Sequence, residues 1–227
     1  MFSFYGTKKK LARLYDLPEY PTIIEPFAGA AGYSLYGDNY KKNVVLYDTN
    51  PKIAAVWEYL ISAEKTDILN LPNIVTGQKV TDFKLTDAQK WLIGFCINTG
   101  SSCPKITASK RTAWNSYKTE IAENIHKIKH WKIFNKSYEE IPNQEATWFV
   151  DPPYQKAGKY YFGYSKMDFR KLSAWCKNLK GQVIVCENQG ADWLPFDFLT
   201  KHQGSIKSNI EVVWKNKLGL TSPPEQL

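Results

Sequence analysis

Asp151-Pro152-Pro153-Tyr154 places a carboxylate and an aromatic ring side by side. Residues 148–150 before it are apolar and read as the end of a buried strand. Two prolines neither continue a strand nor begin a hydrogen-bonded turn of helix, so they make the loop rigid. An acid next to a stacking ring, beyond the carboxyl end of a strand, suits a flat base that bears an exocyclic amine. A Pro-Pro turn with a solvated Asp and a packed Tyr is the alternative, because so short a motif needs context.

A second stretch has the residues of a nucleotide-type site. Residues 22–24 are rich in β-formers, and Glu25 then leads into Pro26-Phe27-Ala28-Gly29-Ala30-Ala31-Gly32, whose small side chains let a ligand approach the backbone closely. Asp48 follows the next apolar run, 44–47, where an acid is placed to hydrogen-bond ribose hydroxyls. An ordinary βαβ turn is the plainer interpretation, because the Gly29-x-x-Gly32 spacing is weak by itself.

Taken together, these residues resemble the S-adenosylmethionine-dependent DNA methyltransferases that act on amines. The closer match is the Dam-like adenine-N6 group, in which the cofactor motif precedes the catalytic motif. Residues 25–32 are similar to that group's acid-Pro-Phe-x-Gly-x-Gly loop, with the second glycine one place late or replaced by Ala31. Residues 151–154 match its catalytic motif in full.

Three further segments are similar to the family in the same chain order. Phe4-Tyr5-Gly6-Thr7-Lys8 resembles an aromatic-x-Gly-Gly-Lys element that closes over the cofactor, with Thr7 in place of a glycine. Asp48-x-Asn50 resembles the ribose-binding segment, and 183–188 the strand that closes the base pocket. The resemblance extends over most of the chain except roughly residues 62–132.

The resemblance implies a site and a mechanism. Asp151 and the Pro152 carbonyl would each accept one N–H of the target amine, and Tyr154 would stack on the flipped base. Transfer would be direct, with positioning as the main source of rate, so no nucleophilic Cys is needed. The implied catalytic residues are Asp151, Pro152, Pro153 and Tyr154. The implied cofactor-binding residues are Phe4, Tyr5, Gly6, Lys8, Glu25, Pro26, Phe27, Ala28, Gly29, Ala30, Gly32, Asp48, Asn50, Ser137, Tyr138 and Asp151.

Hydrophobic periodicity predicts the elements that must position these residues. Strands are expected at 22–27, 44–47, 147–150, 182–186 and 210–214, a short helix at Lys8–Tyr15, a helix from Pro51 and another at 169–179. This alternation predicts an α/β protein with a mostly parallel sheet and helices on both faces. The resemblance implies a Rossmann-like class I methyltransferase fold whose antiparallel last strand is 210–214.

The organisation predicted for the chain is a catalytic domain, 1–61 and 133–227, with a helical insertion, 62–132, as the candidate target-recognition region. Residues expected to contact DNA lie in the insertion and after the catalytic motif: Lys105, Lys110, Arg111, Lys118, Lys156, Lys159 and Tyr161. The alternative for the insertion is structural. Trp114, Tyr117, Ile121, Ile125 and Ile128 have helical spacing, typical of a helix that packs on the core.

Composition agrees with a nucleic-acid partner. The chain of 227 residues has 30 basic and 22 acidic side chains, a formal net charge of +8 that favours a polyanion, here double-stranded DNA. Four cysteines without a C-x-x-C pair predict reduced thiols and no metal site. No signal peptide or membrane span is evident, so a cytoplasmic enzyme of phage or bacterial type is expected, as a monomer or weak dimer. An endonuclease of a restriction system would be a separate chain.

Several other functions fit part of the sequence. An N4-cytosine methyltransferase would share the scaffold, although that group more often has Ser before the prolines. An RNA guanine-N2 methyltransferase can carry the same tetrapeptide but would not be expected to open with the Phe4–Lys8 element. A nicotinamide enzyme would leave Asp151 to Tyr154 without a role. A nucleic-acid-binding protein with a decayed cofactor site is the alternative from another class.

Overall fold

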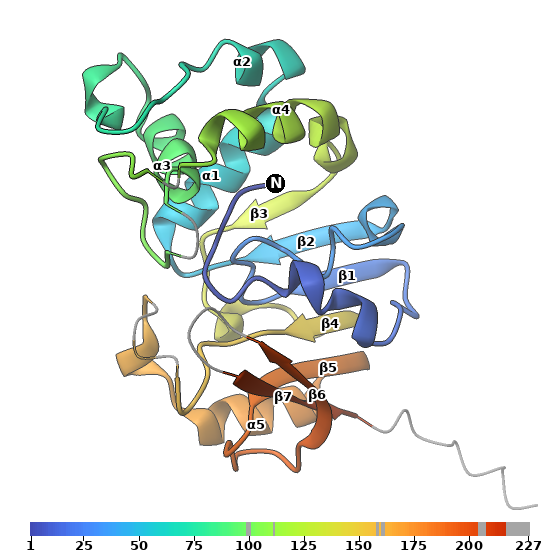
Figure 1. Ribbon diagram of the computed structural model, residues 1–227. Helices are drawn as coiled ribbons and strands as arrows, with labels where there is room; N and C mark the ends of the chain where they lie inside the picture. Colours follow the sequence, from blue (N-terminus) through green and yellow to red (C-terminus); the bar gives the residue numbers. More distant parts are fainter. Residues whose placement is uncertain (99–100, 111, 158, 160–161, 204–207, 217–227) are drawn as a thin grey trace, which may run out of the picture.

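The computed structural model describes residues 1–98, 101–110, 112–157, 159, 162–203 and 208–216 (Figure 1). In these residues, seven strands form one sheet in the order β3-β2-β1-β4-β5-β7-β6. The strands are β1 (Thr22–Glu25), β2 (Asn43–Tyr47), β3 (Lys132–Phe134), β4 (Ala146–Val150), β5 (Gly181–Asn188), β6 (Asp197–Gln203) and β7 (Ser208–Lys215).

The direction of the strands follows the predicted architecture. Neighbours from β3 through β5 are parallel, whereas β7 runs antiparallel to both β5 and β6. The Rossmann-like α/β fold with an antiparallel last strand is therefore confirmed. Because parallel strands end at one edge of the sheet, residues that follow β1, β2 and β4 meet there.

Two strands were missing from the prediction, and one was too long. β3 has only three residues, and β6 is a mostly polar edge strand, so neither has a strong hydrophobic signal. β1 ends at Glu25 rather than at residue 27, because Pro26 has no backbone N–H to donate to a neighbouring strand.

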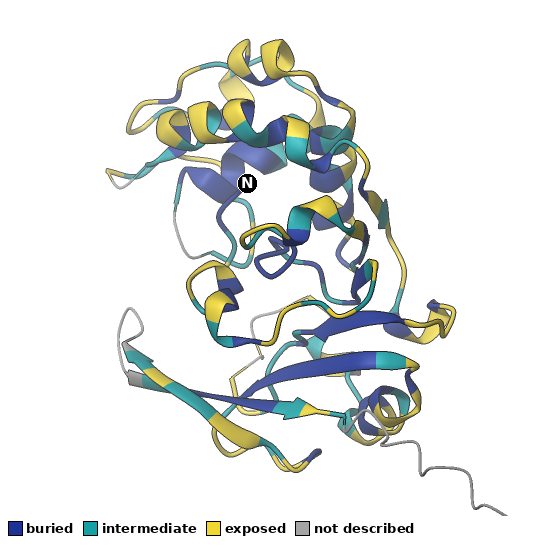
Figure 2. Cartoon of the chain, turned by 90° about the vertical axis from the view of Figure 1, so that its right-hand side faces the viewer, coloured by how far each residue is buried: buried dark blue, intermediate teal, exposed yellow. Residues whose placement is uncertain are grey.

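Both faces of the sheet are covered. Ile23 and Phe149 point into one core cluster, and Ile24 and Trp148 point into the other, as the alternation of side chains along a strand requires. Helices α1 (Pro51–Ser62), α3 (Asp87–Cys96) and α4 (Trp114–Asn124) pack on the first face, and α5 (Phe169–Asn178) packs on the second. The buried inner surfaces and exposed outer surfaces of these elements are visible in Figure 2.

The helix ends have clear local causes. Asn50 caps α1 by accepting the N–H of Lys52 at 3.1 Å, and Pro51 occupies the first helical position as predicted. Asp168 caps α5 by accepting the N–H groups of Arg170 and Lys171. None of the described helices is long and apolar enough to cross a membrane.

The helix expected at Lys8–Tyr15 is wrong in type. The segment forms two 3₁₀ turns, η1 (Lys8–Lys10) and η2 (Ala12–Leu14). It lies against the small-residue loop so closely that a Cβ on Gly32 would lie 2.7 Å from the backbone nitrogen of Lys9. Contacts with a distant segment therefore override the helical pattern of a sequence this short.

Residues 62–132 contain α2 (Lys65–Leu69), η4 (Val80–Asp82), α3, α4 and η5 (Ile125–Ile128). Trp114, Ile121, Ile125 and Ile128 are buried in the same core cluster as the first face of the sheet, and the Trp114 indole donates to the Pro72 carbonyl at 2.8 Å. The packing interpretation of this hydrophobic pattern is correct. The use of the region for target recognition stays a prediction.

Candidate functional site

A cavity of about 740 Å³ opens where β1, β2 and β4 end. Its wall combines the N-terminal segment, the loop after β1, the residues after β2 and the loop after β4. All the residues that the sequence predicted for catalysis or cofactor binding line it, except Pro26. Ser137, Tyr138 and Glu139, which follow β3, complete the wall, so the structure brings five segments that are far apart in the sequence into one site.

The loop after β1 has an unusual backbone. Gly29 and Ala31 both adopt positive φ angles, +45° and +48°, in the left-handed region that favours glycine. Ala31 therefore has a backbone conformation that glycine adopts more readily than alanine does. A Cβ on Gly29 would lie 3.1 Å from the Phe4 ring, so the N-terminal segment lies directly on this loop.

Glu25 ends β1 and is buried beneath this loop. Its Oε1 accepts the backbone N–H of Ser34 at 2.8 Å. Burial raises the pKa of Glu25 to about 8, although the hydrogen bonds from Ser34 oppose the rise. Glu25 therefore fastens the loop to the sheet.

Asp48 follows β2 and fixes the loop from the other side. Its two carboxylate oxygens accept the backbone N–H of Gly29 at 3.0 Å and that of Asn50 at 2.8 Å. Burial raises its pKa to about 6, against these two hydrogen bonds. The Trp57 indole adds a bond to the Gly29 carbonyl at 2.8 Å, so the small-residue loop is tied to both β2 and α1.

Asp151 follows β4 and is paired with the N-terminal segment. Its Oδ1 lies 2.7 Å from Lys8 Nζ. Burial raises the pKa of Asp151 to about 6, although the Lys8 charge opposes the rise. Asp151 is therefore mostly ionised at neutral pH.

Glu211 on β7 is the member of this cluster that the sequence did not identify. Its Oε1 accepts the hydroxyls of Tyr15, at 2.8 Å, and Tyr154, and lies 3.5 Å from Lys8 Nζ. One sequence signal was available. Glu211 lies two residues before the core residue Val213, so its side chain is on the same face of the strand and is an acid at an inward position.

Tyr154 is held by Glu211 and Lys8. Its hydroxyl is hydrogen-bonded to Glu211, and Lys8 Nζ lies 4.7 Å from the centre of its ring. Tyr154 lines the cavity as predicted, with the orientation of its ring set by its hydroxyl.

The loop after Tyr154 is anchored to β5. Glu187 accepts the backbone N–H of Gln155 at 2.7 Å and the Trp193 indole at 3.0 Å. Beyond it, Phe162, Gly163, Ser165 and Met167 line the cavity, as do the less expected Asp168 and Lys171 at the start of α5. These last two follow no motif and were not predicted.

Ser137 and Tyr138 follow β3. Both line the cavity, together with Glu139. Ser137 caps η6 (Tyr138–Glu140), and Tyr138 packs against Phe27 with ring centres 5.7 Å apart. Thr7, Ala31, Thr49 and Phe149 are further lining residues that the prediction omitted.

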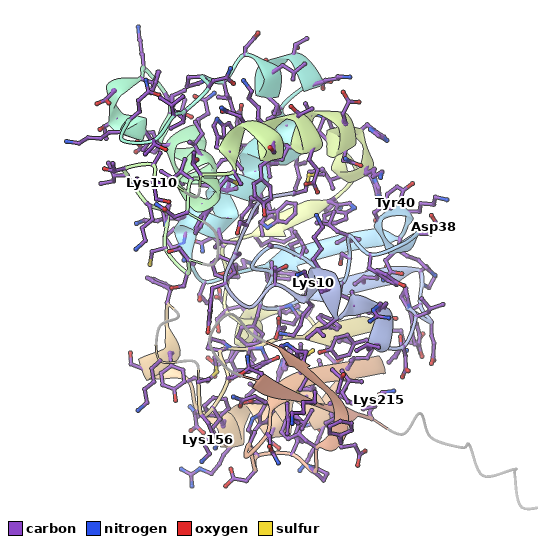
Figure 3. All side chains as sticks on the ribbon, in the orientation of Figure 1. Lys10, Asp38, Tyr40, Lys110, Lys156 and Lys215 are labelled. Carbon is purple, nitrogen blue, oxygen red and sulfur yellow. The ribbon has the colours of Figure 1, made fainter. Side chains whose placement is uncertain are left out.

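The residues expected to contact DNA fall into three groups. Lys105, Lys110, Lys156 and Lys159 are exposed. Figure 3 places Lys110 and Lys156 on the flank where the parallel strands end, and Lys215 on the other flank. Lys118, in contrast, donates to the Leu71 carbonyl at 3.0 Å and to Asn73 at 2.6 Å. Arg111 and Tyr161 lie outside the described residues.

Comparisons with known proteins give matches among solved structures alone. No protein-family model matches the chain, and no curated protein matches it. A solved structure from Escherichia coli, described as a candidate methyltransferase, is 8% identical with a TM-score of 0.34 and covers 85% of this chain and 74% of its own. A candidate methylase from Haemophilus influenzae is 12% identical with a TM-score of 0.34, over 85% of this chain and 78% of its own. Similarity this low transfers no activity, so function has to be inferred from the site.

Proposed function

We propose that this protein methylates the N6 amine of adenine in DNA, with S-adenosylmethionine as the methyl donor. One observation carries the proposal. The rigid loop of Asp151 to Tyr154 and the small-residue loop of Gly29 to Gly32 line the same cavity, with the Phe4–Lys8 segment between them. An amine-binding acid beside a nucleotide-type loop is the arrangement that methyl transfer to a base amine requires.

The lining residues fit this cofactor. The cavity has a volume typical of sites for ligands of this size. The small residues 28–32 leave the backbone open to close approach, and Asp48 stands at the end of β2, where an acid suits ribose hydroxyls. When bound, S-adenosylmethionine supplies an electrophilic methyl group on its sulfonium.

Asp151 prepares the target amine. An adenine amine is a poor nucleophile because its lone pair is delocalised into the ring. Two acceptors, the Asp151 carboxylate and the Pro152 carbonyl, would each take one N–H and favour a pyramidal nitrogen with an outward lone pair. Because these groups are fixed by the proline loop before the base arrives, little reorganisation is needed.

Asp151 also accepts the proton that the methylated amine loses. The N-methylated amine carries a positive charge and loses one N–H proton to the Asp151 carboxylate as or after the methyl moves. An acid with a pKa of about 6 is mostly ionised at neutral pH and still basic enough to hold this proton briefly. Tyr154 offers the flat surface on which a base that leaves the duplex can stack.

Methyl transfer to genomic DNA tests the proposal. Unmethylated DNA is incubated with labelled S-adenosylmethionine and the wild-type protein, Asp151→Asn or the surface control Asp38→Asn, and its nucleosides are identified by mass spectrometry. We expect N6-methyladenine from the wild type and the control, and at least a hundredfold less from Asp151→Asn. Sequencing of the product then gives the target site.

The other outcomes identify the rival functions. N4-methylcytosine would keep the mechanism and replace the base. No DNA product, with cofactor binding by calorimetry intact, would contradict DNA as substrate and direct the assay to RNA. Absence of cofactor binding would leave a non-catalytic nucleic-acid-binding protein.

A further inference from the structure

Lys8 is a buried cation at the wall of the cavity. Its side chain is 5% exposed, and its ammonium donates to Asp151 at 2.7 Å and to the Gly6 carbonyl at 3.2 Å. A charge this buried is costly unless it is paired. Lys8 has two carboxylates near it, because Glu211 lies 3.5 Å away on the side of β7.

We infer that Lys8 reads the target base by donating a hydrogen bond to the ring nitrogen next to the amine that Asp151 accepts. The inference rests on the proposed function and deepens it. Adenine presents an amine donor at position 6 beside a ring acceptor at N1. Asp151 and Lys8 present the complementary pair, an acceptor beside a donor, on one wall of the cavity.

Glu211 makes this exchange of partners feasible. When the base amine takes the Asp151 oxygen, Lys8 loses its shortest hydrogen bond and needs another counter-charge. Glu211 supplies it and is itself held by the hydroxyls of Tyr15 and Tyr154. Glu211 is thus a positioning residue for Lys8 rather than a group that touches the base.

The charges of the cluster also suit the reaction. Methylation places a positive charge on the amine, which a lone cation beside it would oppose. Here one ammonium, Lys8, is matched by the two carboxylates of Asp151 and Glu211, so the cluster as a whole does not repel that charge. Lys8 can therefore donate to the ring without cancelling the electrostatic benefit of Asp151.

Base analogues test the inference directly. The target site found by sequencing is placed in a duplex with adenine, with 1-deazaadenine, which keeps the amine but lacks N1, or with 3-deazaadenine, which keeps both. We expect wild-type kcat/KM to fall about tenfold to a hundredfold on 1-deazaadenine, the effect of losing a hydrogen bond to a charged group. On 3-deazaadenine it should stay close to the adenine value.

Lys8→Met should abolish the discrimination. The variant is expected to methylate adenine and 1-deazaadenine at rates within about twofold of each other. Because the variant lacks the Lys8 ammonium, its ratio of rates also measures any intrinsic difference in reactivity between the two amines. Lys9→Met is the matched control, because Lys9 is the next residue, is 64% exposed and pairs with Glu120. It should discriminate as the wild type does.

Each outcome separates the inference from the proposed function. Equal wild-type rates on adenine and 1-deazaadenine, or discrimination retained in Lys8→Met, would overturn the role of Lys8 and leave the methyltransferase proposal standing. No methylation of the adenine duplex would overturn both. Equal wild-type rates on the two bases overturn the role of Lys8 without any variant, so the inference can be refuted even if Lys8→Met does not fold.

Discussion

The ionisation of Asp151 sets an expectation for pH. Burial raises its pKa to about 6, and the carboxylate is the form that accepts an amine proton. We predict that kcat/KM rises with pH through about 6 and then levels. In Lys8→Met the rise should shift to higher pH, because the Lys8 charge lowers the pKa of Asp151. Rate profiles from about pH 5 to pH 9 measure both. A flat profile, or the same midpoint in both proteins, would contradict this assignment.

Glu25 links stability to pH. Its pKa is raised by burial to about 8 in the folded protein, against about 4.3 in an unfolded chain. The folded state therefore holds this proton more tightly, and the stability due to Glu25 falls as pH rises between these two values. Glu25→Gln cannot ionise, so its unfolding free energy should decrease less over this window than that of the wild type.

Urea unfolding at about pH 5.5 and pH 8 measures this difference. The remaining slope belongs to other groups, among them Asp48 and Asp151, whose pKa values burial also raises. Glu123→Gln, an exposed member of an ion pair with Lys65, is the control and should keep the wild-type dependence. An unchanged slope in Glu25→Gln would show that Glu25 does not hold this proton.

Among the elements, the junction of β4 and β5 tolerates little change at Gly181. Gly181 begins β5 with φ of +95°, and a Cβ there would lie 2.3 Å from the Ala146 carbonyl oxygen on β4. β4 leads directly into Asp151, so this register positions the loop of Asp151 to Tyr154. We predict that Gly181→Ala destabilises the protein by about 3 kcal/mol or more, from backbone strain and a clash with main-chain atoms.

Denaturant midpoints check this prediction against a matched variant. Gly77 has a φ of +88°, similar to that of Gly181, but a Cβ at Gly77 would have no atom within 4 Å. Gly77→Ala carries the backbone strain alone and should cost about 1–2 kcal/mol. Equal losses in the two variants would show that the contact with β4 does not matter.

At the scale of the whole molecule, the excess of positive charge predicts binding to phosphates. Lys105, Lys110 and Lys156 are exposed, and two of them lie on the flank where the parallel strands end (Figure 3). Replacing all three by Ala should weaken DNA binding and reduce the slope of log K against log salt by about 0.9 for each lysine that contacts a phosphate. Titrations by fluorescence anisotropy at several salt concentrations measure the slope.

Lys215 provides the control for this surface. It lies on the other flank in Figure 3 and pairs with Asp16 at 2.7 Å. Lys215→Ala should leave both affinity and slope near the wild-type values. If Lys215→Ala reduces the slope as much as one of the three predicted lysines does, binding would depend on net charge rather than on this flank.

Features that depend on neighbours along the chain could be predicted before the fold was known. Apolar runs predicted five of the strands, Pro51 marked the start of α1, and the two prolines after Asp151 predicted a rigid loop. Each of these features follows from local backbone chemistry or from hydrophobic periodicity, and a few consecutive residues are enough to show either one. The parallel α/β architecture followed from the order of these elements.

Features that depend on residues far apart in the chain could not be predicted and were found in the folded protein. The pairing of Lys8 with Asp151, and of both tyrosines with Glu211, requires the N-terminal segment, β4 and β7 to meet. The 3₁₀ turns at 8–14 exist because the segment packs on the Gly32 loop. The pattern of neighbouring residues does not predict such contacts, because it is the order of the strands in the sheet that brings these side chains together. The same order makes Lys8, which the sequence marked only as part of a motif, the partner of Asp151.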